Sequence, residues 1–226
     1  MGIILSEIEA IFFDIDGTLS NSDDHIIEEI TRRIRFLRFF WKEQNLQKFA
    51  RASVSLAMTG FNISYHLVDR LGIDDFIVRT FPHKKKNRDR ESFDKDHSLI
   101  TGVEEMLQDL HRKYRLGIIS ARSDSGVLDF IQKFSLQQYF DVLVSGQTCY
   151  YSKPFPHPLL FAADAMHVQP ERCLMVGDTV VDILAGKAAG MRTIGVLSGF
   201  GTQKELKKAA ADFILKSIAD LRFLLS

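Results

Sequence analysis

A short apolar run that ends in two carboxylates is the feature that most constrains the fold of this chain. Residues 10–13 are all apolar, Asp14 and Asp16 follow them, and Gly17 comes next. Such a run predicts a short strand that is buried on both faces, as in a parallel sheet. The carboxyl end of that strand would deliver Asp14 and Asp16 to the crevice outside the sheet, where open α/β folds bind ligands.

The two carboxylates predict a cation beside them. In an extended segment Asp14 and Asp16 lie on the same side, so both can face one ligand, and two like charges this close repel each other. Hard oxygen atoms with no His or Cys nearby favour Mg²⁺ over Zn²⁺. Asp-x-Asp and Asp-Gly also occur in ordinary turns, so this stretch alone leaves both a ligand site and a plain turn open.

Composition narrows the class of protein. The chain has 226 residues, 46% of them hydrophobic, and its 29 Lys and Arg equal its 29 Asp and Glu. This balance offers no electrostatic basis for a nucleic-acid or membrane partner. No apolar stretch reaches the length of a membrane span, and the two cysteines lack metal-site or disulfide-scaffold spacing. We therefore expect a cytoplasmic protein, either a monomer or a homodimer.

The segment after the first strand has a different character. Apolar residues at helical spacing predict three helices, at residues 26–41, 46–58 and 63–71. A charged run at residues 84–91 is typical of a solvated loop. We therefore expect a helical cap domain over residues 20–95, inserted after the first strand of a core domain formed by residues 1–19 and 96–226.

From Thr101 onward, predicted helices and strands alternate, which indicates βαβ units and a parallel sheet. The predicted strands are residues 115–119, 140–144, 173–176, 193–197 and 212–215. The predicted helices are residues 103–111, 125–134, 158–166 and 181–189, followed by a closing helix. The expected fold class is therefore α/β.

Further polar residues fall at strand ends or in the loops after them, namely Ser120, Lys153, Asp178 and Asp182. In a parallel sheet these ends share one edge, so the four side chains should converge on Asp14 and Asp16. Each also has an ordinary interpretation. Ser120 could cap the next helix, Lys153 could be an exposed loop lysine, and Asp178 and Asp182 could be the cap and surface of their helix.

Four segments in order resemble the motifs of haloacid dehalogenase superfamily phosphatases, over nearly the whole chain. They are Phe-Asp-Ile-Asp-Gly-Thr-Leu at 13–19, Ile-Ser-Ala-Arg at 119–122, Lys-Pro-Phe-Pro at 153–156 and Gly-Asp-Thr-Val-Val-Asp at 177–182. Within that superfamily the chain resembles the phosphoglycolate phosphatase-like group, which has a helical (C1-type) cap. This resemblance implies a Rossmann-like parallel sheet with helices on both faces and a cap over the site.

The resemblance also implies a reaction. Asp14 would attack the phosphorus of a phosphomonoester to form an aspartyl phosphate, which divides hydrolysis into two easier steps. Asp16 would protonate the leaving oxygen and later take a proton from water, assistance typically worth about 10²–10⁴-fold. Mg²⁺ would lie between Asp14, the main-chain carbonyl of Asp16 and Asp178, with Asp182 able to ligate the metal or its waters.

Phosphate binding is assigned by the same resemblance to Ser120, the backbone of Ala121 and Lys153, which supplies a fixed positive charge. The expected partner is a small phosphorylated metabolite, with phosphoglycolate as the leading candidate. Two alternatives stay open: a phosphosugar mutase, which would use the same Asp14 and Asp16, and a non-catalytic binding protein on the same fold. A dehalogenase is disfavoured because it does not need the second carboxylate, Asp16.

Overall fold

The computed structural model describes residues 7–21 and 98–225. Its contacts divide the chain into two compact units, one made of Met1–Asp23 with Ser98–Ser226 and the other of Asp24–His97. The helices predicted at 26–41, 46–58 and 63–71 and the loop predicted at 84–91 lie outside the described residues. The helical cap over residues 20–95 therefore stays a prediction.

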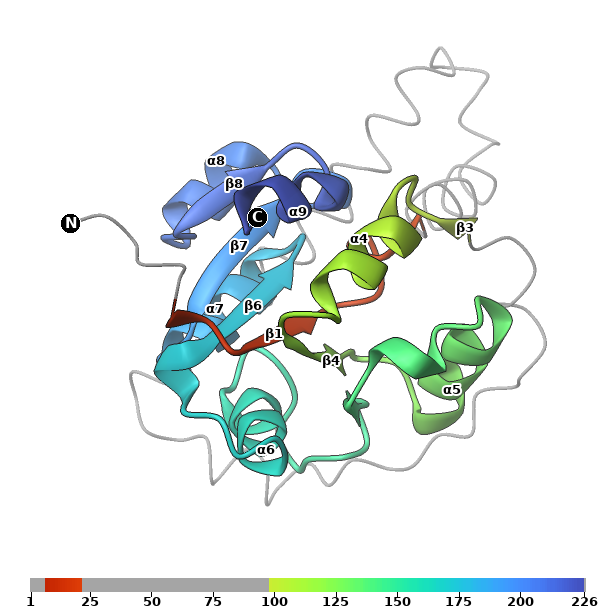
Figure 1. Cartoon of the computed structure of the whole chain (residues 1–226). Coiled ribbons are helices and arrows are strands. Elements are labelled where there is room, and N and C mark those ends of the chain that lie inside the picture. Colours follow the sequence, from red (N-terminus) through yellow and green to blue (C-terminus); the bar gives the residue numbers. More distant parts are fainter. Residues whose placement is uncertain (1–6, 22–97, 226) are drawn as a thin grey trace, which may run out of the picture. The chain divides into compact units, whose positions relative to one another are not determined.

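A six-stranded parallel sheet forms the centre of the described unit (Figure 1), and it confirms the predicted α/β fold class. Its strands are β1 (Ala10–Phe13), β4 (Arg115–Ile119), β5 (Val142–Val144), β6 (Cys173–Gly177), β7 (Arg192–Val196) and β8 (Phe213–Leu215). The strand order is β5-β4-β1-β6-β7-β8. The chain thus builds outward from β1 on one side and then resumes at β6 on the other. This reversal creates a switch point beside β1, where open α/β sheets bind ligands.

Strand β1 is buried on both faces, as its sequence predicts. Ile11 and Phe13 belong to one apolar cluster, and Ala10 and Phe12 belong to another on the opposite face. Side chains of α4 (Val103–Leu110), α5 (Asp124–Lys133) and α9 (Leu221–Leu224) complete the first cluster. Those of α6 (His157–Ala165) and α7 (Val180–Ala188) complete the second. Helices therefore cover both faces of the sheet. Because all six strands are parallel, their carboxyl ends lie at one edge.

Several short elements were not predicted. Strand β2 (Ser20–Asn21) pairs antiparallel with β3 (Ser98–Leu99), so the two chain segments that flank residues 22–97 lie side by side. Helix α8 (Gln203–Lys208) starts at a capping box between Thr202 and Glu205. A strand of two residues is too short to show an apolar run, and a helix of six residues makes fewer than two turns, so neither is recognised from sequence.

Short 3-10 turns complete the unit, at η3 (Gln137–Tyr139), η4 (Pro170–Arg172) and η5 (Ile218–Asp220). The predicted closing helix is divided between η5 and α9. Within the described ranges, none of the helices has both the length and the apolar composition that crossing a membrane requires.

Candidate active site

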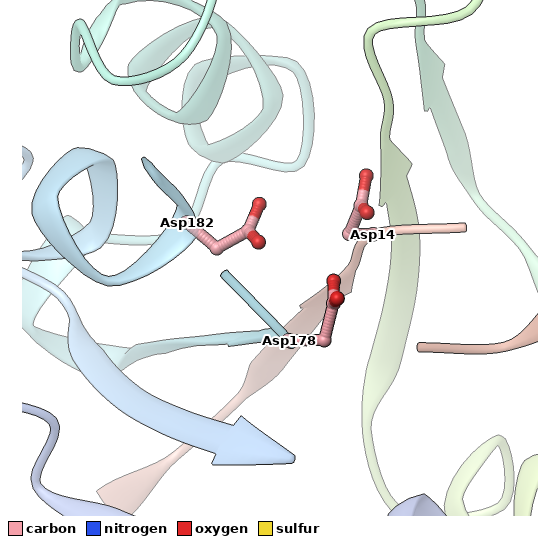
Figure 2. Close-up of side chains that lie close together, drawn as sticks. All are labelled: Asp14, Asp178 and Asp182. Carbon is pink, nitrogen blue, oxygen red and sulfur yellow. The ribbon is translucent and has the colours of Figure 1, made fainter. Parts of the chain in front are cut away.

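Three carboxylates meet at the carboxyl edge of the sheet, beside the switch point (Figure 2). Asp14 follows β1, Asp178 follows β6, and Asp182 lies in the first turn of α7. Each carboxylate offers one oxygen that lies within 4.8 Å of the oxygens from the other two. Asp14 is 8% exposed, Asp178 is 0% exposed and Asp182 is 1% exposed. The predicted convergence of Asp14 with both later carboxylates is therefore present.

Lys153 lies among these carboxylates. Its Nζ donates to Asp14 Oδ1 at 2.8 Å, to Asp182 Oδ1 at 2.7 Å and to the main-chain carbonyl of Ile119 at 2.8 Å. An ammonium group has three N–H donors, so these acceptors account for all of them. The side chain is only 7% exposed, and the interpretation of Lys153 as an ordinary exposed loop lysine is wrong.

Burial has the largest single effect on the pKa values of both Asp14 and Lys153. It raises the pKa of Asp14 from 3.8 to about 7, and the carboxylates of Asp182 and Asp16 add to the rise while Lys153 opposes it. Burial alone would lower the pKa of Lys153, but the charges of Asp14 and Asp182 outweigh it, so the pKa is raised and the lysine stays charged. Three carboxylates and one ammonium thus leave an excess of negative charge in a buried site.

Asp178 is packed against backbone that leaves no room for side chains. A Cβ on Gly17, at φ +77°, or on Gly199 would overlap the Asp178 carboxylate, and a Cβ on Gly201 would overlap its main-chain carbonyl. Asp178 Oδ2 accepts a hydrogen bond from the Phe200 N–H at 2.8 Å. These close approaches fix the position of the carboxylate, and the loop at 199–201 comes from a part of the chain that the sequence interpretation did not assign to the site.

Asp182 belongs to the group of three carboxylates and also stabilises the start of helix α7. Thr179 is the N-cap of α7, and its N–H and hydroxyl both donate to Asp182 Oδ2, at 3.1 and 2.6 Å. The other oxygen, Oδ1, accepts from Lys153. Because Asp182 is buried, the interpretation that it lies on the surface of its helix is wrong. It links the start of α7 to the lysine of the site.

Ser120 and Ala121 follow β4 at the same edge. Ser120 is 4% exposed and its Oγ accepts from the N–H of Arg122 at 3.2 Å, while Ala121 is exposed. Ser123, rather than Ser120, caps α5 by accepting from the Gly126 N–H. The capping interpretation of Ser120 is therefore wrong, and its phosphate-binding role stays a prediction.

The carboxylate of Asp16 forms an ion pair with Arg122, a residue to which the sequence analysis assigned no role. Arg122 donates from Nε to Asp16 Oδ2 at 2.9 Å and from Nη2 to Asp16 Oδ1 at 2.6 Å. The group of three carboxylates with converging oxygens does not include the side chain of Asp16. The expectation that Asp16 helps to bind metal through its main-chain carbonyl stays a prediction. Arg122 stands directly after the Ser-Ala pair, and this position was the signal available in the sequence.

Comparison with known proteins agrees with this geometry. Residues 11–196 match the family model of the haloacid dehalogenase-like hydrolases. The chain belongs to that family. As a haloacid dehalogenase-like hydrolase it is an enzyme, and the resemblance predicted from the four motifs is confirmed.

Individual relatives are similar to this hydrolase over nearly its whole length. Pyrophosphatase PpaX from Bacillus pumilus is 29% identical over 219 residues, which are 96% of this chain and 95% of the relative. A predicted phosphoglycolate phosphatase from Haemophilus somnus superposes with a TM-score of 0.65 at 20% identity, with 100% of both chains covered. CbbY from Rhodobacter sphaeroides, in complex with phosphate, gives 0.60 at 22% identity and covers 95% and 96% of the two chains. These two solved structures share the fold.

The carboxylate site of this hydrolase suits a divalent cation. Asp14, Asp178 and Asp182 present hard oxygen atoms, the ligand type that Mg²⁺ prefers. Burial raises the pKa of Asp14, and the carboxylates of Asp182 and Asp16 add to the rise; a bound cation would favour the ionised form of this carboxylate. The residues present therefore fit the metal that the sequence predicts.

Proposed function

We propose that this hydrolase is a Mg²⁺-dependent phosphatase that cleaves a small phosphomonoester through an aspartyl phosphate on Asp14. The observation that carries the proposal is the contact of a buried, charged lysine with the carboxylate of Asp14, inside a cluster of acidic groups. This arrangement keeps a nucleophilic oxygen beside a fixed positive charge. Such a site suits an anionic phosphoryl group that the acidic cluster alone would repel.

Each residue has a proposed task. Asp14 forms the bond to phosphorus, and Lys153 offsets negative charge on both Asp14 and the phosphoryl oxygens. Ser120 and the backbone at Ala121 bind phosphoryl oxygens, and Asp16 handles the proton of the leaving oxygen. Asp14, Asp178, Asp182 and the Asp16 carbonyl hold Mg²⁺, which when bound offsets the charge of nucleophile and substrate.

The substrate class follows from similarity and stays part of the proposal. The relative from Bacillus pumilus is named a pyrophosphatase, and the solved protein from Haemophilus somnus is named a predicted phosphoglycolate phosphatase. Pyrophosphate and phosphoglycolate, the compounds in these two names, are small and carry a terminal phosphoryl group. We propose phosphoglycolate as the leading candidate and pyrophosphate as the second compound to test.

The test is phosphate release by the full chain from pyrophosphate and from a panel of phosphate esters, with Mg²⁺ and with chelator. We expect metal-dependent release that the Asp14→Asn variant loses. Asp164→Asn is the matched control, because it makes the same chemical change at an exposed position on α6 and should leave turnover unchanged. Release that persists in Asp14→Asn would refute the nucleophile assignment. Absence of release from every ester with the wild-type protein would refute the phosphatase and favour the mutase or the binding protein.

A further inference from the structure

Arg122 is a second cationic side chain at the site, and its environment differs from that of Lys153. Lys153 donates to three protein acceptors and is 7% exposed. The Arg122 side chain is 18% exposed, and its partner Asp16 is 37% exposed. The ion pair between Arg122 and Asp16 therefore borders the open side of the site, whereas Lys153 lies inside it.

The guanidinium of Arg122 is held in a fixed orientation. Its Nε and Nη2 form a two-bond contact with the Asp16 carboxylate, and its Cζ lies 5.4 Å from the centre of the Phe130 ring. The main chain is fixed too, because the Gly146 N–H donates to the Arg122 carbonyl at 2.8 Å. Asp16 accepts from two of the five N–H groups of the guanidinium, and the three others, on Nη1 and Nη2, form a second planar edge that matches the two oxygens of a carboxylate or phosphate.

The contact with Asp16 also places Arg122 relative to the substrate. In the proposed function Asp16 handles the proton of the leaving oxygen, so a residue bonded to Asp16 lies on the leaving-group side of the scissile bond. We propose that Arg122 is the specificity residue that binds a second anionic group, a carboxylate or phosphate carried by the leaving group. This inference rests on the proposed phosphatase activity and names its substrate class, which is compounds with a phosphoryl group and an anionic leaving group.

Pyrophosphate shows how the chemistry balances. An Asp14 carboxylate oxygen bonds to one phosphorus while the bridging P–O bond breaks, and the second phosphate departs with the electron pair, takes the proton of Asp16 and leaves as hydrogen phosphate. Water then cleaves the aspartyl phosphate to hydrogen phosphate, restores the Asp14 carboxylate and returns a proton to Asp16. Arg122 would stabilise the departing anion, whose developing charge appears on its side of the site.

The test compares two esters of the same size. Phosphoglycolate carries a carboxylate, and 2-hydroxyethyl phosphate carries a neutral hydroxymethyl group in its place. We expect the wild-type enzyme to favour phosphoglycolate by at least about tenfold in kcat/KM, because a hydrogen bond between charged groups is worth roughly ten- to a hundredfold. A wild-type ratio near one would overturn the proposal without any variant.

Variants separate anion binding from positioning of Asp16. Arg122→Ala should lower kcat/KM for phosphoglycolate by roughly ten- to a hundredfold more than for the neutral ester, with the difference mainly in KM, because loss of the contact with Asp16 affects both esters alike. Arg122→Lys should recover part of the loss, because it keeps the charge without the planar fork. Arg192→Ala, at the exposed start of β7 on the opposite edge of the sheet, is the matched control for loss of one positive charge and should change neither ester.

An equal fall in kcat/KM for both esters in Arg122→Ala would overturn the proposal, since it would mean that Arg122 acts only by positioning Asp16. The proposed function fails in a different way. If the wild-type enzyme releases no phosphate from either ester or from pyrophosphate, the phosphatase itself is refuted. If it releases phosphate from the neutral ester as readily as from phosphoglycolate, the phosphatase stands and the role of Arg122 is refuted.

Discussion

Replacement of Asp14 by Asn is expected to stabilise the metal-free protein at pH 8, although it removes the proposed nucleophile. The pKa of Asp14 rises from 3.8 to about 7 on burial. A carboxyl with a higher pKa in the folded state binds its proton more tightly when folded. The free energy of unfolding therefore falls as the pH rises from about 4 to about 7. Asn resembles the neutral acid and lacks this dependence.

The size of the effect follows from the shift. Each pKa unit corresponds to about 1.4 kcal/mol, so a rise of about three units sets an upper limit of roughly 4 kcal/mol on the gain at pH 8. Lys153 keeps its ion pair with Asp182 in the variant, so the change leaves no buried lysine unpaired. Relaxation around the ionised carboxylate reduces the gain, and we expect about 1–3 kcal/mol.

The assay is urea unfolding followed by circular dichroism in chelator, between pH 4 and pH 8. The wild-type protein and Asp14→Asn should have similar stability near pH 4 and diverge as the pH rises, with the variant more stable. Added Mg²⁺ should raise the stability of the wild type more than that of the variant, because ligands stabilise the state that binds them. Equal stability of both proteins at pH 8 in chelator would refute the reasoning.

Asp212→Asn is the matched control with the opposite sign. Burial raises the pKa of Asp212, but hydrogen bonds from Lys187 and Thr193 outweigh this and lower it. The stabilising contribution of Asp212 is present above the pKa of the unfolded chain and is lost as the pH falls through the folded pKa. Asn at this position should therefore destabilise the protein at pH 8, and the difference from wild type should shrink in acid.

Three further substitutions test the packing of the site. Gly199→Ala places a Cβ on the Asp178 carboxylate and should abolish stabilisation by Mg²⁺ in thermal melts, at a cost of about 1–3 kcal/mol; an unchanged Mg²⁺ response would contradict it. Lys153→Ala leaves Asp14 and Asp182 without their shared cation and should lower the free energy of unfolding in chelator at pH 8 by about 3–5 kcal/mol; a loss below 1 kcal/mol would argue against it. Gly146→Ala brings a Cβ against the Ala121 carbonyl and should reduce kcat/KM at least about tenfold by shifting the Ser120 loop, which steady-state kinetics would detect.

Local pattern was sufficient for the sheet and for most residues of the site. The apolar run before Asp14 predicts β1, and the strands that lead to Ser120 and Asp178 lie within one or two residues of their predicted bounds. A strand buried on both faces appears in the sequence as a continuous apolar run, and a helix of eight residues or more shows a periodicity of about 3.6 residues. Since parallel strands end at one edge, the same pattern also predicts that Asp14, Lys153, Asp178 and Asp182 approach one another.

Tertiary structure alone decided which atoms these residues contact. The bonding of Lys153 to both Asp14 and Asp182, the pairing of Asp16 with Arg122, and the approach of Gly199 to Asp178 all join residues from separate strand ends. Such contacts depend on side-chain orientation and on close packing across the sheet edge, and sequence spacing carries neither. The sequence by itself determined where the carboxylates gather. The folded chain determined which of them has a raised pKa, which of them share Lys153, and which cation pairs with Asp16.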